Sequence, residues 1–179
     1  MMKEKADTWQ MELTQLTWEF EKLLNDFDLT RLNQKPDPHQ WSPMEIIHHL
    51  VLVNTSYFPT FDQLAKNTHQ SPILGKIPFI GKKIGQMILD ANKKPQKIKT
   101  FKTWEPSSGS TYNNDLLAAF FKQQDELSGY IQDLDHLLDQ NLMIRSPAND
   151  WIFYSLDDAF EIIITHEKRH LNQLEKILK

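Results

Sequence analysis

The chain has 179 residues, 40% of them hydrophobic and 25% charged, so it is long enough to form one domain with a substantial core. A net charge of -4 gives no basic surface for nucleic acid, no apolar run is long enough to cross a membrane, and residues 1–5 lack the apolar stretch of a signal peptide. We therefore expect a single cytoplasmic domain, residues 1–179, that binds neither nucleic acid nor membranes.

Four segments show the 3.6-residue hydrophobic period of amphipathic helices. The first expected helix covers about residues 6–26, and the second covers about residues 42–66 with a bend or interruption at Pro59. The third covers about residues 112–140, and the fourth begins after Ser155. With five glycines and no long run of alternating β-branched residues, the chain is expected to be an all-α four-helix bundle.

A long insertion, about residues 68–111, separates the second and third expected helices and exceeds the length of a simple bundle loop. Residues 79–89 have the pattern of a short amphipathic helix, and residues 93–102 form a basic stretch. Two interpretations stay open. The insertion is either a lid that supplies apolar and basic contacts to an anionic substrate or thiol cofactor, or a helix that closes one end of the bundle.

The motif HEKRH at residues 166–170 places two histidines four positions apart, so on a helix they share a face and can bind one metal ion. The same letters fit the H-E-x-x-H pattern of zinc proteases. Such a protease needs a third ligand downstream, but nine residues follow His170, and Lys176 stands where the extended pattern has a histidine. We therefore expect the third ligand upstream.

Residues 41–50 provide the upstream candidate. They begin as a helix should, with Ser42 as N-cap and Glu45 placed to complete a capping box. The apolar stripe that follows on the helical wheel lies closer to His49 than to His48. Its members are Ile46, Leu50, Val53, Tyr57 and Phe61. His49 is therefore predicted at the edge of the buried face, and His48 towards solvent.

The last expected helix has an apolar inner face with His170 near its centre and His166 at its edge. That face consists of Leu156, Phe160, Ile163, Leu171, Leu174 and Leu178. Glu167 falls on the same side, where an ionised carboxylate is costly unless it is paired, hydrogen-bonded or near a metal. Its position fits a catalytic residue and equally a boundary residue that reaches a lysine or arginine.

Three imidazoles on one ion leave a coordination position open for water or substrate, as in catalytic rather than structural metal sites. The chain has no cysteine, so every ligand must be a nitrogen or oxygen atom. Zinc and nickel suit imidazole best, while iron, manganese and cobalt stay open.

Two motifs together resemble those of the DinB-like superfamily, some of whose members are described as metal-dependent hydrolases. They are W-S-P-x-E at residues 41–45 with His49-Leu50, and H-E-x-x-H-L-x-Q at residues 166–173. The resemblance covers most of the chain and implies a four-helix bundle of up-down-down-up topology. It further implies a metal held by His49, His166 and His170, and kinship with bacillithiol and mycothiol S-transferases and maleylpyruvate isomerases.

We predict a divalent-metal-dependent enzyme, a hydrolase or a thiol S-transferase, that acts on a small molecule. The ion would activate water for hydrolysis or the thiol of a low-molecular-weight cofactor for transfer. Glu167 is the candidate proton acceptor, or else a partner of a ligand histidine. The alternative is a non-catalytic helical bundle that binds a metal or ligand in a stress response. The substrate, the native metal and the choice between monomer and homodimer stay open.

Overall fold

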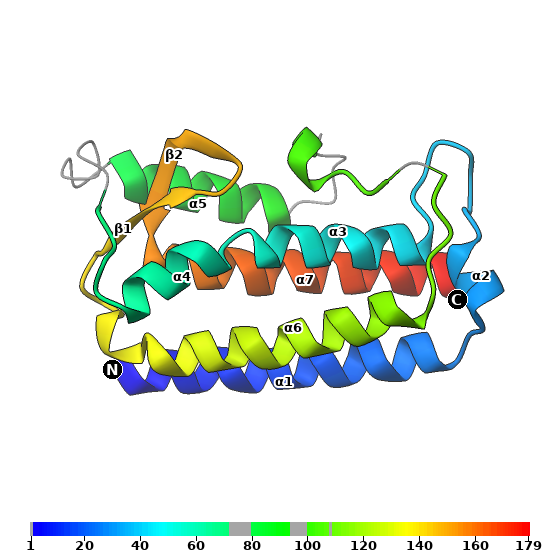
Figure 1. Cartoon of the computed structure of the whole chain (residues 1–179), viewed down its shortest axis with the longest axis horizontal. Helices are drawn as coiled ribbons and strands as arrows, with labels where there is room; N and C mark the ends of the chain where they lie inside the picture. Colours follow the sequence, from blue (N-terminus) through cyan, green and yellow to red (C-terminus); the bar gives the residue numbers. More distant parts are fainter. Residues whose placement is uncertain (1, 72–79, 94–99, 108) are drawn as a thin grey trace.

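Four long helices form a bundle in the computed structural model, which describes residues 2–71, 80–93, 100–107 and 109–179. They are α1 (Met2–Asn25), α3 (Pro43–Thr55), α6 (Asn114–Asp133) and α7 (Leu156–Leu178). In Figure 1, α1 and α7 run from left to right, whereas α3 and α6 run from right to left. The predicted four-helix bundle with up-down-down-up topology is confirmed.

Each long helix packs beside two others. Helix α1 lies against α6 and α7, and α3 lies against the same two helices. Helices α6 and α7 therefore face each other across one diagonal of the bundle, and α1 and α3 face each other across the other. This arrangement places α3 and α7, the helices that carry the histidine motifs, side by side.

Shorter elements connect the long helices. They are α2 (Leu29–Asn33), α4 (Phe58–Ala65), α5 (Ile80–Lys93), η2 (Lys102–Trp104), η3 (Asp135–Leu137), β1 (Met143–Ser146) and β2 (Asn149–Ser155). Helix α5 confirms the amphipathic helix expected in the insertion, over residues 80–89. Residue 79 and most of the predicted basic stretch, residues 94–99, lie outside the described part of the chain.

The two helices that carry the histidines begin with the same device. Ser42 Oγ accepts a hydrogen bond from the backbone N–H of Glu45, and the Glu45 carboxylate accepts one from the backbone N–H of Ser42, at 3.2 and 2.8 Å. Ser155 and Asp158 repeat this capping box at the start of α7. These reciprocal bonds fix the first turn, and so the rotational position of every later residue on the helix.

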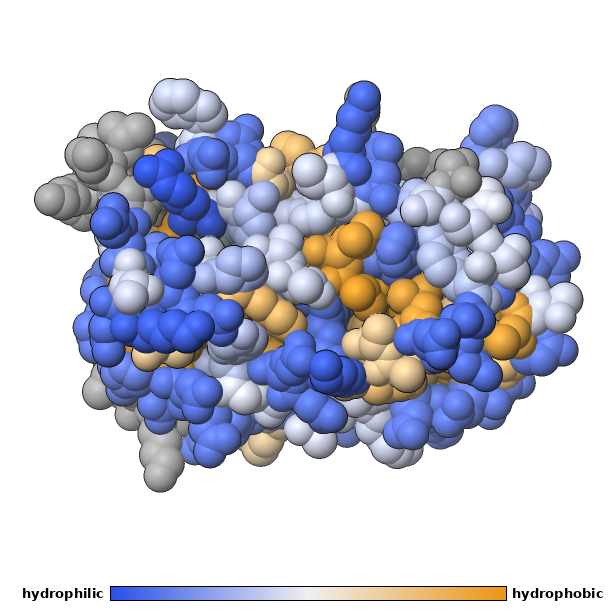
Figure 2. Space-filling model, viewed as in Figure 1, coloured by the Kyte–Doolittle hydropathy of each residue, from blue (hydrophilic) through white to orange (hydrophobic). Residues whose placement is uncertain are grey.

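The inner faces predicted from the hydrophobic period are buried. On α3 and α4 every member of the stripe from Ile46 to Phe61 is at most 5% exposed. The core is rich in aromatic rings: Phe160 on α7 packs against Trp9 and Phe61, with ring centres 5.6 and 4.9 Å away. The face seen in Figure 2 is mostly hydrophilic at its rim, with a hydrophobic strip across its centre.

Helix α5 lies close against β2 and the first turns of α7, and two glycines permit this approach. A Cβ atom at Gly81 would collide with the Met143 side chain, and one at Gly85 would lie 2.5 Å from Asp158 Oδ2. Gly81 therefore lets α5 approach the hairpin, and Gly85 lets it approach the start of α7.

The structure differs from the expected elements after α6. The third helix was expected to reach about residue 140, but α6 ends at Asp133, and Asp139 and Asn141 adopt positive φ angles of 60° and 52° that no α-helix contains. The antiparallel hairpin of β1 and β2 was not predicted. Among the described residues, none of the helices combines the length and the hydropathy that a bilayer crossing requires.

Candidate metal centre

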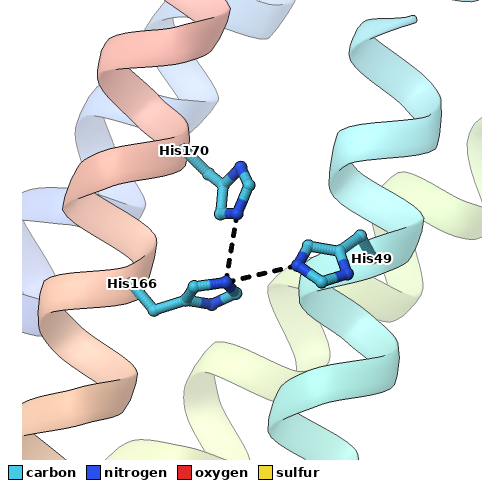
Figure 3. A group of neighbouring side chains, drawn as sticks. All are labelled: His49, His166 and His170. Carbon is cyan, nitrogen blue, oxygen red and sulfur yellow. Dashed lines mark hydrogen bonds between the residues drawn. The ribbon is translucent and has the colours of Figure 1, made fainter. Parts of the chain in front are cut away.

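Three histidines from two helices converge in the bundle (Figure 3). His49 lies on α3, and His166 and His170 lie one turn apart on α7. His166 Nε2 is 3.2 Å from His49 Nε2 and 3.1 Å from His170 Nε2. Their ligand atoms all lie within 4.8 Å of one another. The structure thus brings together the three residues predicted as metal ligands.

His49 is buried as predicted, whereas His48, predicted towards solvent, is partly covered by Tyr112. His49 is 3% exposed and points into the cluster, as does His170 with 7% exposure. His48 is half-buried, and its Nδ1 atom lies 3.0 Å from the Tyr112 hydroxyl, away from the other histidines. His49 is therefore the histidine of α3 that can share an ion with α7.

Hydrogen bonds on the outer side of two of the rings determine which ring nitrogen carries the proton. His49 Nδ1 lies 2.7 Å from the main-chain oxygen of Trp104, and His170 Nδ1 lies 3.0 Å from Gln173 Oε1. Because both oxygens are acceptors, both Nδ1 atoms must carry the proton. In a neutral ring the Nε2 atom is then an unprotonated lone pair, and both lone pairs face His166.

Burial keeps the three rings neutral. It lowers the pKa of His49, takes that of His166 well below its ordinary value and that of His170 to about 3, and the positive charge of Arg169 acts in the same direction on each ring. An imidazole binds a metal in its neutral form. The cluster is therefore in its ligand state at pH 7.

This donor set fits a divalent cation. Two inward lone pairs face a third nitrogen, and His166 can donate at most one proton, so one contact lacks a hydrogen whichever tautomer His166 adopts. A cation at the centre satisfies all three nitrogens. The three nitrogens, two pairs of which are 3.1 and 3.2 Å apart and all of which lie within 4.8 Å of one another, are close enough for His49, His166 and His170 to hold one such ion.

Glu167 lies in a separate polar cluster in the bundle interior and is fully buried. Its Oε1 atom accepts hydrogen bonds from Asn54 Nδ2 on α3 and Gln124 Nε2 on α6, at 2.6 and 2.9 Å. Its Oε2 atom has no hydrogen-bond partner among the described residues. Burial raises the pKa of Glu167 to about 7, although the two amide bonds act in the opposite direction. Of the two interpretations of Glu167, the boundary residue that reaches a lysine or arginine is wrong, because its hydrogen-bond partners are the amides of Asn54 and Gln124.

Several neighbours of the site were not assigned from the sequence. The Trp41 ring packs against His49 with ring centres 5.0 Å apart, and its place in the W-S-P motif was the available signal. The hydrogen bond that the Trp104 carbonyl accepts from His49 has no signal in the sequence, because a main-chain atom is the acceptor. Asn54 and Gln124 occupy inward positions that a hydrophobic pattern assigns to apolar residues.

The sequence profile described as the DinB superfamily matches residues 12–174 of this chain. The chain belongs to the DinB superfamily. The match spans both histidine motifs, the whole of α3 and α6 and parts of α1 and α7. This DinB protein therefore has its three clustered histidines within the region that matches the family. A comparison with curated proteins finds no match.

Among solved structures, the DinB protein is similar to YfiT from Bacillus subtilis, with a TM-score of 0.65 and 16% sequence identity. The similarity covers 98% of this chain and 86% of the YfiT chain. YfiT is described as a probable metal-dependent hydrolase with an unusual four-helix bundle topology. At this level of identity the likeness establishes the shared fold.

Proposed function

We propose that this DinB protein is a metal-dependent enzyme that binds one divalent ion through His49, His166 and His170. The observation that carries the proposal is the convergence of three Nε2 atoms, two of them held as lone pairs by bonds on the far side of the ring. Three protein ligands leave a further position for water or substrate, which is the arrangement of catalytic sites.

The chain's own residues prepare the site in two ways. The Trp104 carbonyl and the Gln173 side chain orient two of the rings and exclude the wrong tautomer. Burial of the rings keeps them unprotonated. When bound, a divalent cation would supply Lewis acidity, which activates water or a thiol near neutral pH.

Glu167 is proposed to support the site and is also the candidate proton acceptor. Its pKa of about 7 suits proton transfer near neutral pH. Its hydrogen bonds to Asn54 and Gln124 favour the supporting role. They hold Glu167 at a fixed depth in the bundle and so also position His166, the preceding residue.

The proposed reactions are hydrolysis of a small molecule and transfer of a low-molecular-weight thiol to an electrophilic small molecule. The description of YfiT as a probable metal-dependent hydrolase supports the first. Zinc and nickel are the proposed ions because imidazole nitrogen suits both. No nucleic acid or membrane partner is proposed, in line with the net charge of -4.

The test is the metal content of untagged protein, purified without chelator, measured by plasma mass spectrometry. We expect about one divalent ion per chain in the native protein, and loss of that ion in the His49→Ala and His170→Ala variants. His48→Ala is the matched control, because it removes the neighbouring histidine of the same helix and should retain the metal.

Metal-loaded native protein is then assayed for ester and amide hydrolysis and for thiol transfer, with the His166→Ala variant as blank. Protein that takes up no zinc, nickel or other divalent ion would refute the proposal and favour the non-catalytic bundle. Loss of metal in His48→Ala with retention in His49→Ala would show that the ligand of α3 is wrongly assigned.

A further inference from the structure

In the described part of the insertion between α4 and α6, Trp104 reaches the histidine cluster. The η2 turn packs against α3, and the main-chain oxygen of Trp104 lies 2.7 Å from His49 Nδ1. The ring of Trp41 packs against the same imidazole. A residue from the insertion therefore determines how a predicted metal ligand is protonated and turned.

The Trp104 side chain holds its own carbonyl in place. Its indole N–H donates a hydrogen bond of 3.2 Å to Ser56 Oγ, at the end of α3. His49 and Ser56 are seven residues apart, which is about two turns and about 10 Å along the same side of a helix. Trp104 thus bonds α3 at two points, with its backbone at one and its side chain at the other.

The Phe101 ring strengthens this attachment. It meets the Trp104 indole edge to face, with ring centres 5.7 Å apart and planes at 85°. The η2 turn is only three residues long, so it depends on contacts with its neighbours for its position. The indole bond to Ser56 is consequently the main restraint that the described residues show between this turn and the end of α3.

The two oriented ligands depend on different parts of the chain. His170 takes its acceptor, Gln173, from the next turn of its own helix. His49 takes its acceptor from the insertion, 55 residues further along the chain. A change at Trp104 should therefore affect His49 and leave His170 unchanged, which gives the protein an internal control.

We propose that the insertion completes the metal centre: Trp104 is a positioning residue whose carbonyl holds His49 in the tautomer that presents Nε2, and whose indole fixes that carbonyl to α3 through Ser56. The inference rests on the proposed metal site, which it deepens by making ligand geometry depend on the insertion. Anything that moves the η2 turn then changes the affinity of the site for its ion.

The first experiment measures the tautomers of His49 and His170 in metal-free protein by ¹⁵N–¹H NMR of the imidazole rings. Native protein should show Nδ1–H for both histidines. Trp104→Phe, which keeps an aromatic ring but loses the indole N–H, should give His49 a mixture of tautomers and leave His170 as it was. Ser56→Ala removes the acceptor and should have the same effect. Trp151→Phe is the matched control, because Trp151 is 80% exposed.

The second experiment measures zinc affinity by competition with a chromogenic chelator at fixed pH. Loss of an outer contact to a metal-bound histidine typically weakens binding 10- to 100-fold. Trp104→Phe and Ser56→Ala should each raise the Kd for zinc about tenfold, and the double variant should be no weaker than the singles, because both remove one bond. Trp151→Phe should bind as the native protein does.

The inference is overturned if His49 keeps a single tautomer in both variants, if His170 changes as much as His49, or if the Kd for zinc stays within twofold of native. Failure of the proposed function has a different signature. If the native protein binds no metal, the proposed metal site is wrong. The tautomer of His49 in metal-free protein would still show whether Trp104 positions the His49 ring.

Discussion

Two glycine-to-alanine substitutions on different helices should change stability in opposite directions. Gly85 lies in α5, where a Cβ atom would sit 2.5 Å from Asp158 Oδ2 and 3.1 Å from Asp158 Cβ. Asp158 is the third residue of α7, and its carboxylate accepts the backbone N–H of Ser155 in the capping box. Gly129 lies in α6 with open space around its Cβ position.

The expected magnitudes follow from these neighbours. Gly-to-Ala within a helix gains about 1 kcal/mol from backbone propensity alone, so Gly129→Ala should stabilise by about that amount. At Gly85 the same gain is opposed by about 1–3 kcal/mol of overpacking and about 1 kcal/mol for the displaced capping bond. The net result is a loss of about 2 kcal/mol for Gly85→Ala.

Thermal and urea unfolding followed by circular dichroism measure both variants. For a chain of this size 1 kcal/mol corresponds to about 2–4 °C, so Gly85→Ala should lower Tm by about 4–8 °C and Gly129→Ala should raise it by about 2–4 °C. A Gly85→Ala protein as stable as Gly129→Ala would show that α5 does not pack on the start of α7 as described, and the reasoning would fail.

Three further predictions concern the polar groups of the interior. Zinc at about 100 times its Kd should stabilise the native protein by about 2.7 kcal/mol, and thermal unfolding of His166→Ala should not respond to zinc; an equal response would place the ion elsewhere. Gln173→Ala should raise the Kd for zinc about tenfold in a chelator competition, whereas Asn172→Ala should not; equal affinities would mean that the glutamine does not orient its histidine. Gln124→Leu should lower the free energy of unfolding, measured in urea, by about 1–3 kcal/mol, because buried Glu167 loses a hydrogen-bond donor. Gln132→Leu, at an exposed position of the same helix, is the control, and unchanged stability of Gln124→Leu would contradict the role of Gln124 as that donor.

The bundle and the clustered histidines could be predicted because they depend on periodic side chains. The stripe from Ile46 to Phe61 fixes which side of α3 and α4 is buried, and the same register turns His49 inwards and His48 outwards. Capping residues at Ser42 and Ser155 located the starts of two helices within one residue. Local signals of this kind need no knowledge of the partner helix.

The features that were missed depend on contacts between distant segments. The carbonyl of Trp104 could not be found from residue types, because every residue has one. Strand β1 has four residues, too few to show a clear alternation, and it gains its partner only by folding back on β2. Gln124 is 2% exposed, yet a polar side chain on an amphipathic helix is normally assigned to the solvent face.

The buried polar cluster gives the H-E-x-x-H motif a different meaning here from the one it has in a zinc protease. Glu167 bonds Asn54 on α3 and Gln124 on the diagonally opposite α6, and Thr17 on α1 approaches the Gln124 side-chain oxygen at 3.4 Å. The Glu167 carboxylate of α7 thus bonds directly to side chains of α3 and α6, and the Gln124 side chain extends the cluster to α1. A buried polar group is costly unless its hydrogen-bond partners are in place. If α7 slid along its axis, Glu167 would lose these partners, so the hydrogen bonds favour the observed position of α7. Since His166 is the adjacent residue, the same restraint fixes the depth at which the α7 histidines meet His49.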